Sequence, residues 1–141
     1  MIQILELLQP RYDILNKNRE GYKYRLTERY EHHLLHRAQY PEIVLSCTLH
    51  SLYGRQGVIA FEAGYCWDGC SGPTIDRPVT MLASLVHDGF YQLMRERLLE
   101  QRYRADADWE FYDILDVHHF TFAKLYHVGV STFAGYAARP R

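Results

Sequence analysis

The sequence predicts an α+β fold, with a small N-terminal antiparallel β-sheet, a glycine-rich loop, and then two helices packed antiparallel. Three observations support it: strand-like segments before about residue 65, a dense group of glycines in residues 64–73, and helical spacing of apolar residues after residue 78. The 141 residues contain no repeat or linker-like tract. We therefore expect a single domain over residues 1–141, strand-rich over about 20–65 and helical over about 78–130.

Three short segments are predicted to form the sheet. Residues 22–26 (YKYRL) alternate large apolar with basic side chains, residues 42–49 (EIVLSCTL) are rich in β-branched residues, and residues 57–63 (GVIAFEA) follow a glycine turn. Residues 31–37 (EHHLLHR) would place His32 and His36 one turn apart if they were helical, as in a metal site. The flanking alternation instead favours an exposed polar stretch of strand and turn.

Two longer helices follow the glycine-rich loop. The first is predicted to begin after residue 78, with Thr80 as its N-cap, and the second to run from about Arg104 to Tyr126. A short amphipathic helix is also predicted at residues 2–8, ending near Pro10. The candidate core residues of the two longer helices are Leu82, Leu85, Val86, Tyr91 and Met94, and Trp109, Phe111, Tyr112, Ile114 and Leu115.

The composition argues against several classes of protein. Sixteen basic and seventeen acidic side chains give a net charge of −1, so there is no global field to attract nucleic acid. No apolar run is long enough to span a bilayer, so no transmembrane segment is predicted. Three cysteines and a start without a basic, apolar leader predict neither a disulfide-rich secreted domain nor a signal peptide, which favours a reducing interior.

The dipeptide His87-Asp88 is the candidate catalytic and metal-binding centre. Adjacent residues on a helix point about 100° apart, whereas His87 and Tyr91, four residues apart, share one face. The imidazole of His87 is therefore predicted to act as a general base on water, and the carboxylate of Asp88 to face a hard cation. Glycines in the preceding loop let backbone carbonyls converge on such a cation, and Asp68 would add a carboxylate.

A general-base histidine needs a carboxylate on its far ring nitrogen to fix its tautomer. Asp108 on the second helix is the best candidate, and Asp106 is the alternative. Tyr91 is expected to hydrogen-bond the same aspartate.

Two other kinds of site remain open from the residues alone. Cys66 and Cys70, with His87 or His50, could bind zinc, although small buried thiols are the simpler interpretation of a loose C-x-x-x-C. A phosphohydrolase with an upstream histidine, an His-Asp pair and a further aspartate is the other alternative. Its upstream histidine should lie on a helix, whereas His50 lies in strand-like sequence.

The motif order resembles a family of small phage and prophage proteins of uncharacterised role, domain of unknown function 1353. The likeness covers roughly residues 22–136 and rests on D-G-x-S-x-P, then H-D-x-x-Y, then A-D-x-x-F. It implies a phage origin, and thus location in the bacterial host cytoplasm or in the virion. In this sequence the three motifs fall on Asp68, Gly69, Ser71 and Pro73, on His87, Asp88 and Tyr91, and on Ala107, Asp108 and Phe111.

A more distant likeness is to the calcium-dependent phospholipase A2 enzymes, which share the order of loop, H-D-x-x-Y helix and partner aspartate. It implies that Asp88 binds calcium, with loop carbonyls near Trp67 and Gly69 and with Asp68. It also implies that His87 is the base and Asp108 its orienting partner. The helix-bridging disulfides of those enzymes have no counterpart here, since no cysteine follows Cys70.

From these likenesses we predict a phage-encoded, calcium-dependent hydrolase that acts on an ester, most simply in a lipid at a membrane surface. The alternative is a non-catalytic component of the phage particle, such as a tail, baseplate or assembly protein, that retains the scaffold and binds other virion proteins.

Overall fold

The computed structural model describes residues 9–16, 19, 21–36, 38–41, 47–50, 57–69, 77–133 and 138–140, with the backbone alone at residues 47–50 and 133. The predicted helix at residues 2–8 lies outside these residues. So do Cys70, Gly72 and the motif residues Ser71 and Pro73.

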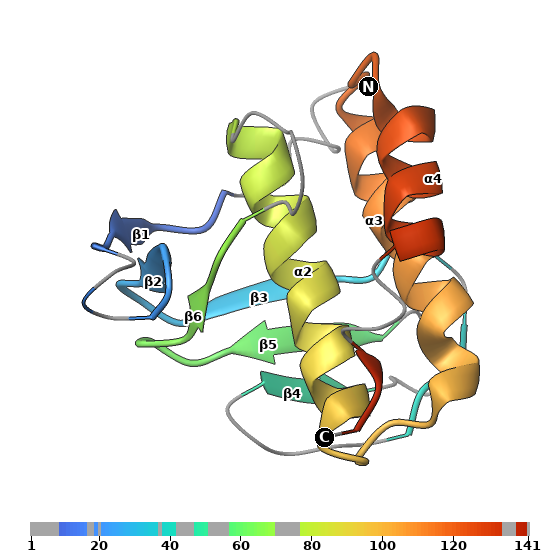
Figure 1. Cartoon of the computed structure of the whole chain (residues 1–141), viewed down its shortest axis with the longest axis horizontal. Helices are drawn as coiled ribbons and strands as arrows, with labels where there is room; N and C mark the ends of the chain where they lie inside the picture. The colour runs from blue at the N-terminus through green and yellow to red at the C-terminus, as the bar shows by residue number, and fades with distance from the viewer. Residues whose placement is uncertain are drawn as a thin grey trace.

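The strands form two small antiparallel sheets, so the predicted α+β class is confirmed, although the strands do not form the single sheet that was expected. One sheet has the order β1-β2-β6 and the other the order β3-β5-β4 (Figure 1). The strands are β1 (Tyr12–Ile14), β2 (Tyr24–Leu26), β3 (Tyr30–His33), β4 (Cys47–His50), β5 (Val58–Phe61) and β6 (Cys66–Trp67).

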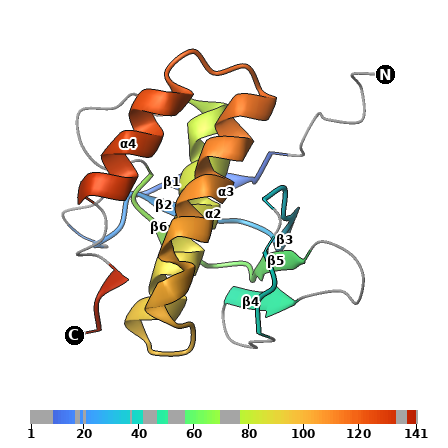
Figure 2. The ribbon, with the colours of Figure 1, turned by 90° about the vertical axis from the view of Figure 1, so that its right-hand side faces the viewer.

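Helix α2 (Pro78–Arg95) is the centre of the molecule. Every residue from Thr80 to His87 is buried, so this part of the helix is enclosed on all sides. The strands cover one side of α2 and helix α3 (Arg104–Val117) packs antiparallel on the other (Figures 1 and 2). The apolar residues predicted for this helix's core side are all buried: Leu82, Leu85, Val86, Tyr91 and Met94.

The N-cap of α2 is Arg77, so the prediction of Thr80 at that position was wrong by three residues. Pro78 takes the first helical position, where its fixed φ and missing N–H are tolerated. Thr80 still stabilises the start of the helix, because its hydroxyl oxygen accepts a hydrogen bond from the backbone N–H of Arg77 at 2.8 Å. The Pro78 ring, rather than the hydroxyl residue, marks the boundary.

The single second helix predicted from Arg104 to Tyr126 is two helices, α3 and α4 (Ala123–Phe133), and a short 3-10 turn, η2 (Gln101–Tyr103), precedes α3. His119 has a φ of 57° and ends α3 in a left-handed conformation. The N–H of Phe120 bonds the Leu115 carbonyl and that of His119 bonds the Asp116 carbonyl, which is a Schellman ending. The prediction failed because glycine usually occupies this position and here a histidine does.

Helix α4 lies against α3 and beside it in Figure 2, where α3 is in front of α2. This arrangement corrects the prediction that Trp109 faces the core, because its side chain is 44% exposed and stacks on His127 of α4, with ring centroids 4.0 Å apart. Tyr112 is half-buried, whereas Phe111, Ile114 and Leu115 are buried as predicted. None of the described helices is both long and apolar enough to cross a membrane.

Leu85→Ala should lower the free energy of unfolding by about 2–5 kcal/mol, because it opens a cavity in the core beside the buried part of α2. Leu85 is fully buried. The matched change Leu125→Ala, on an exposed part of α4, should change stability by less than about 0.5 kcal/mol. Chemical denaturation of both variants measures the difference, and equal effects would contradict the central position of α2.

Candidate functional site

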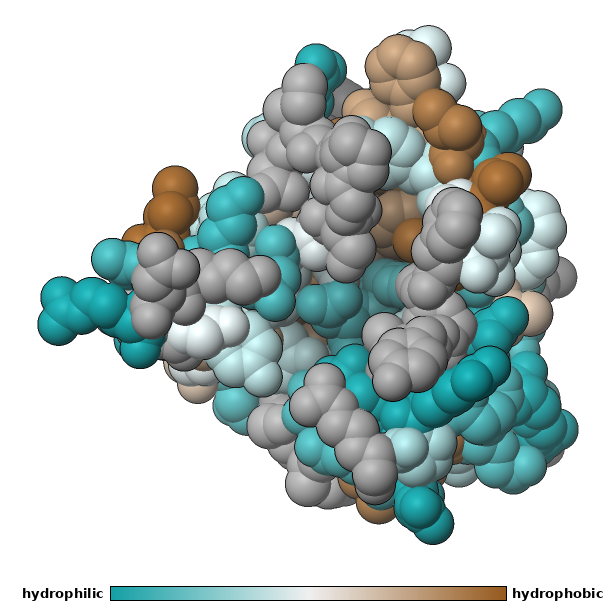
Figure 3. Space-filling model, viewed as in Figure 1, coloured by the Kyte–Doolittle hydropathy of each residue, from teal (hydrophilic) through white to brown (hydrophobic). Residues whose placement is uncertain are grey.

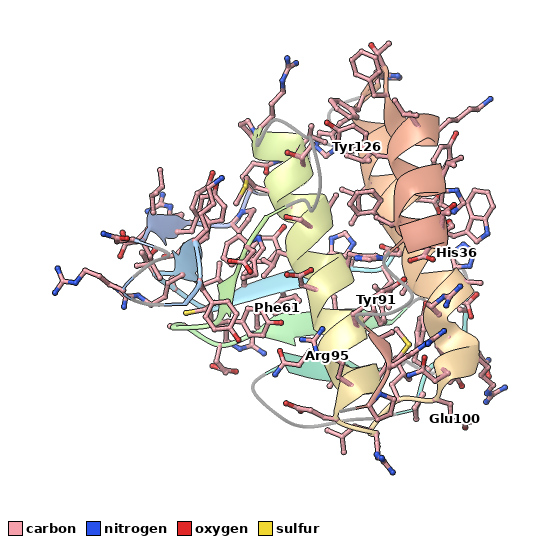
Figure 4. The ribbon with its side chains drawn as sticks, in the orientation of Figure 1. His36, Phe61, Tyr91, Arg95, Glu100 and Tyr126 are labelled. Atoms are coloured by element: carbon pink, nitrogen blue, oxygen red, sulfur yellow. The ribbon has the colours of Figure 1, made fainter. Side chains whose placement is uncertain are left out.

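Helix α2 carries the candidate site on two of its faces. His87 and Tyr91, one turn apart, face α3, and Figure 4 shows Tyr91 directed from α2 toward that helix. Ser84 and Asp88, also one turn apart, face strand β6 and the residue after it. The adjacent residues His87 and Asp88 therefore contact different elements, α3 and the end of β6, as the helical geometry requires.

The side chains of His87, Tyr91 and Asp108 meet between α2 and α3. The Nε2 of His87 lies 2.7 Å from Oδ1 of Asp108, and the hydroxyl of Tyr91 donates to the same oxygen, also at 2.7 Å. The ring of Phe111 packs edge-on against the imidazole, with ring centroids 5.3 Å apart. The sequence-predicted set is therefore brought together, with Asp108 rather than Asp106 as the partner of His87.

The hydrogen bonds define which nitrogen of His87 is available. An ionised Asp108 only accepts, so Nε2 carries the proton and the neutral ring has its lone pair at Nδ1. Nδ1 has no hydrogen-bond partner among the described residues. His87 is 6% exposed and Asp108 2% exposed, so the pair lies almost wholly inside the protein.

Tyr91 acts as a permanent donor in this arrangement. Burial and the hydrogen bond to Asp108 raise the pKa of its hydroxyl well above the usual value. Tyr91 therefore keeps its proton, and together with His87 it satisfies the buried carboxylate.

Strand β6 is fixed to α2 by Trp67. Its indole N–H donates to the hydroxyl of Ser84 at 3.2 Å, and that hydroxyl in turn donates to the Met81 carbonyl at 3.1 Å. The Trp67 ring also packs against Tyr12 and Tyr24, with centroids 5.6 Å apart in each case. Since Asp88 lies one turn after Ser84, this anchor brings the residue after Trp67 beside Asp88.

Asp68 and Asp88 form the second half of the candidate site. Burial raises the pKa of Asp88 to about 6. The charges of His87 and Arg95 lower this pKa, whereas the negative charge of Asp68 raises it further. A backbone hydrogen bond from Asp68 also stabilises the charged form of Asp88. The Oδ1 of Asp68 accepts the backbone N–H of Lys23 at 3.1 Å, which holds this carboxylate near the strand.

These contacts narrow the set of groups that could bind a cation. In a trans peptide the N–H of residue 68 and the carbonyl of residue 67 point in opposite directions, so the Trp67 carbonyl is directed away from Asp88. Gly69 has a φ of 78°, a conformation that strains other residues, and it begins the turn from β6 toward the loop. In the part of the chain that the structure describes, no group of three or more His, Cys, Asp or Glu side chains is arranged to hold a metal.

The described residues do not support the alternative of a zinc site. The Sγ of Cys66 donates to the Gly64 carbonyl at 3.3 Å, and His87 is bound to Asp108. Cys70 and the His50 side chain lie outside the described parts of the chain.

A second histidine and carboxylate network, which the sequence analysis did not predict, joins α3 to strand β3. Glu110 is fully buried, and its Oε1 lies 2.7 Å from Nε2 of His32. Its two oxygens also accept the backbone N–H groups of Leu35 and His36, at 2.6–3.0 Å. A carboxylate with this many donors can remain in the interior.

The prediction that residues 31–37 form an exposed polar stretch was wrong at His32, which is buried, although the strand alternation itself is present. His36 is half-buried and bonds Asp106 at 3.0 Å, with Asp113 3.8 Å away; Figure 4 labels His36 beside α3. Asp106 is therefore engaged with strand-side residues and is not a partner of His87. The missed signal was the spacing i, i+4, i+7 of Asp106, Glu110 and Asp113, which places three carboxylates on one helix face.

Comparisons with known protein families, with curated proteins and with solved structures find no match to this chain. The likenesses to the phage proteins and to phospholipase A2 therefore rest on the motifs alone and stay predictions.

Asp88→Asn should stabilise the protein at pH 7.5 and leave its stability nearly unchanged at pH 4. Since the pKa of Asp88 is raised in the folded state, the wild type loses stability as the pH rises from about 4 through 6. The gain in the free energy of unfolding should be on the order of 1–2 kcal/mol, because Asp88 is only half-buried. Thermal unfolding across this pH range measures it, and Asp116→Asn, at an exposed site on α3, should leave the pH dependence unchanged.

Glu110→Gln should lower the free energy of unfolding by about 3 kcal/mol, because the amide brings an N–H₂ group against backbone donors and removes a buried charge partner of His32. Glu100→Gln is the matched control. The Glu100 carboxylate forms an exposed ion pair with Arg102 at 3.3 Å, so its removal should lower the free energy of unfolding by less than about 1 kcal/mol. Similar losses by urea denaturation would show that the buried network contributes no more than a surface pair.

Proposed function

We propose that this protein is a phage- or prophage-encoded hydrolase that cleaves an ester, most simply in a lipid, through a phospholipase A2-like His-Asp centre that uses calcium. The observation that supports this best is the contact of His87 Nε2 with Asp108 at 2.7 Å, because it leaves Nδ1 as the proton acceptor.

The residues supply the proton chemistry of such a reaction. A water hydrogen-bonded to Nδ1 of His87 would lose its proton to the ring as its oxygen attacks the ester carbonyl. The resulting imidazolium would be stabilised by Asp108, which is held in place by the hydroxyl of Tyr91. The proton would then pass from His87 to the leaving alcohol, which restores the neutral ring.

Asp88 is the proposed calcium ligand, together with Asp68 and the backbone of Gly69. Two carboxylates near each other, one of them with a pKa raised by burial and by the other's charge, form an environment that a divalent cation would stabilise. Trp67 is left out of the ligand set because its carbonyl is directed elsewhere. Bound calcium would polarise the ester carbonyl and stabilise the negative charge that develops on its oxygen.

The test is release of fatty acid from phospholipid vesicles in the presence of calcium or of a chelator. His87→Gln should lower the calcium-dependent rate at least about 100-fold, which is the usual contribution of a general base. His33→Gln is the control, since His33 is exposed on β3 and away from the site. No calcium-dependent release by the wild type, or equal rates for the two variants, would overturn the hydrolase proposal.

Calcium binding has a readout that is independent of turnover. Calcium should raise the melting temperature of the wild type and not that of Asp88→Asn, because the ligand stabilises only a folded protein that binds it. An equal shift in both proteins would remove Asp88 from the proposed site.

The second candidate, a non-catalytic virion component, is favoured by the burial of His87, Tyr91 and Asp108. In that role the three side chains would be a polar network that specifies how α2 packs on α3. An antibody against the chain should then detect it in purified phage particles. Its absence from particles, with the protein present in the infected cell, would contradict this candidate.

A further inference from the structure

The buried carboxylate of Glu110 fixes one face of α3 to the end of strand β3. It accepts hydrogen bonds from the ring of His32 and from the backbone N–H groups of Leu35 and His36, at 2.6–3.0 Å. Glu110 and His32 are 0% and 2% exposed, so water does not compete for these bonds. We call this set of four residues the strand clamp.

The ring of His36 extends the strand clamp along the helix. Its Nε2 lies 3.0 Å from Asp106, and its Nδ1 lies 3.8 Å from Asp113. Asp106 and Asp113 lie one turn before and one turn after Glu110, so the contacts cover roughly two turns of α3.

The carboxylate of Asp108 is held from one side only. Its Oδ1 accepts hydrogen bonds from His87 and Tyr91, which both belong to α2, and it has no other hydrogen bond or ion pair with a described residue. Its distance from the His87 ring therefore depends on how the backbone of α3 is placed and rotated.

Apolar packing alone does not determine that rotation closely. Phe111, Ile114 and Leu115 of α3 are buried, but the burial of apolar surface is a non-directional force. Hydrogen bonds weaken steeply when their distance or angle changes, so they define a rotation much more sharply.

Helix α4 is a weak constraint on α3. Of its described side chains, at residues 123–132, Ala123 alone is buried, and Leu125 and Val128 are 65% and 58% exposed. Figure 3 shows apolar side chains gathered on the surface over the region of α4. Much of the apolar surface of α4 therefore faces away from α3, and the strand clamp is the more specific contact.

We propose that His32 and Glu110 are positioning residues for the pair of His87 and Asp108. The strand clamp fixes the rotation of α3, and this rotation brings Oδ1 of Asp108 against Nε2 of His87. Asp108 and Glu110 are two residues apart, so their side chains leave the helix about 200° apart and a rotation that displaces one displaces the other. The inference deepens the proposed function and rests on it only for the effect on catalysis.

The test is the tautomer of His87, measured from the ¹⁵N chemical shifts of its two ring nitrogens at pH 8.5 without substrate. In the wild type the bond to Asp108 should keep the proton on Nε2. His32→Leu removes the donor to Glu110, so the ratio of the two tautomers should fall about 10-fold, the change expected when one hydrogen bond is weakened. His32→Gln places an amide N–H₂ near the former Nε2 and should restore the wild-type ratio.

Leu26→Ala is the control for a general loss of stability. Leu26 is buried in strand β2 of the other sheet, and its truncation should cost at least as much stability as His32→Leu without a change in the tautomer ratio. An equal fall in Leu26→Ala, or no fall in His32→Leu, would overturn the inference. If His32→Leu does not fold, His36→Leu is the milder variant, because His36 is only half-buried, and it should lower the ratio in the same direction.

The vesicle assay separates this inference from the proposed function. His32→Leu should lower kcat about 10- to 100-fold with KM nearly unchanged, because it misplaces the partner of the base and touches no substrate. Fatty-acid release with the wild-type kcat and an unchanged tautomer ratio would refute the positioning role alone. A changed tautomer ratio in a protein whose wild type releases no fatty acid would refute the hydrolase alone.

Discussion

The hydrogen bond between His87 and Asp108 is the constraint on which the rest of the structure depends. The part of α2 from Thr80 to His87 is buried on all sides, so the imidazole lies in the interior, where an unsatisfied polar group would be strongly destabilising. Asp108 satisfies Nε2 of the ring, and its own Oδ1 accepts hydrogen bonds from His87 and Tyr91. The contact therefore sets the rotation of α2 and of α3 about their own axes.

Helix α3 can occupy the middle of the protein despite its many acidic residues because each of its faces has a different partner. Asp108 and Phe111 face α2, Glu110 faces the segment after β3, and Trp109 faces α4. Asp108 and Glu110 are two residues apart and so point about 200° away from each other. A rotation of α3 by a single residue would separate both carboxylates from their donors, so the two networks together lock the helix in one orientation.

The sequence was most informative where residues close along the chain share a helix face. The spacing of His87 and Tyr91 and the apolar pattern around them predicted which side of α2 meets α3, and Asp108 was the predicted partner. The spacing of Glu110 with Asp106 and Asp113 places these carboxylates on one face of α3, but it does not reveal the donors of Glu110, which are backbone N–H groups and a histidine of a distant strand. The end of α3 at His119 was missed because a left-handed ending without glycine depends on the packing around it rather than on local preference.

The two candidate functions differ in whether they explain the position of Asp88. A network that only specifies helix packing requires no more than His87, Tyr91 and Asp108, since the carboxylate of Asp108 accepts a hydrogen bond from each of the other two side chains. It gives no reason to place a second carboxylate on the neighbouring face, where burial raises its pKa and the charge of Asp68 raises it further. Keeping two carboxylates together in this way destabilises the folded chain unless a cation offsets their repulsion. The position of Asp88 therefore favours the calcium-dependent hydrolase over the purely structural role.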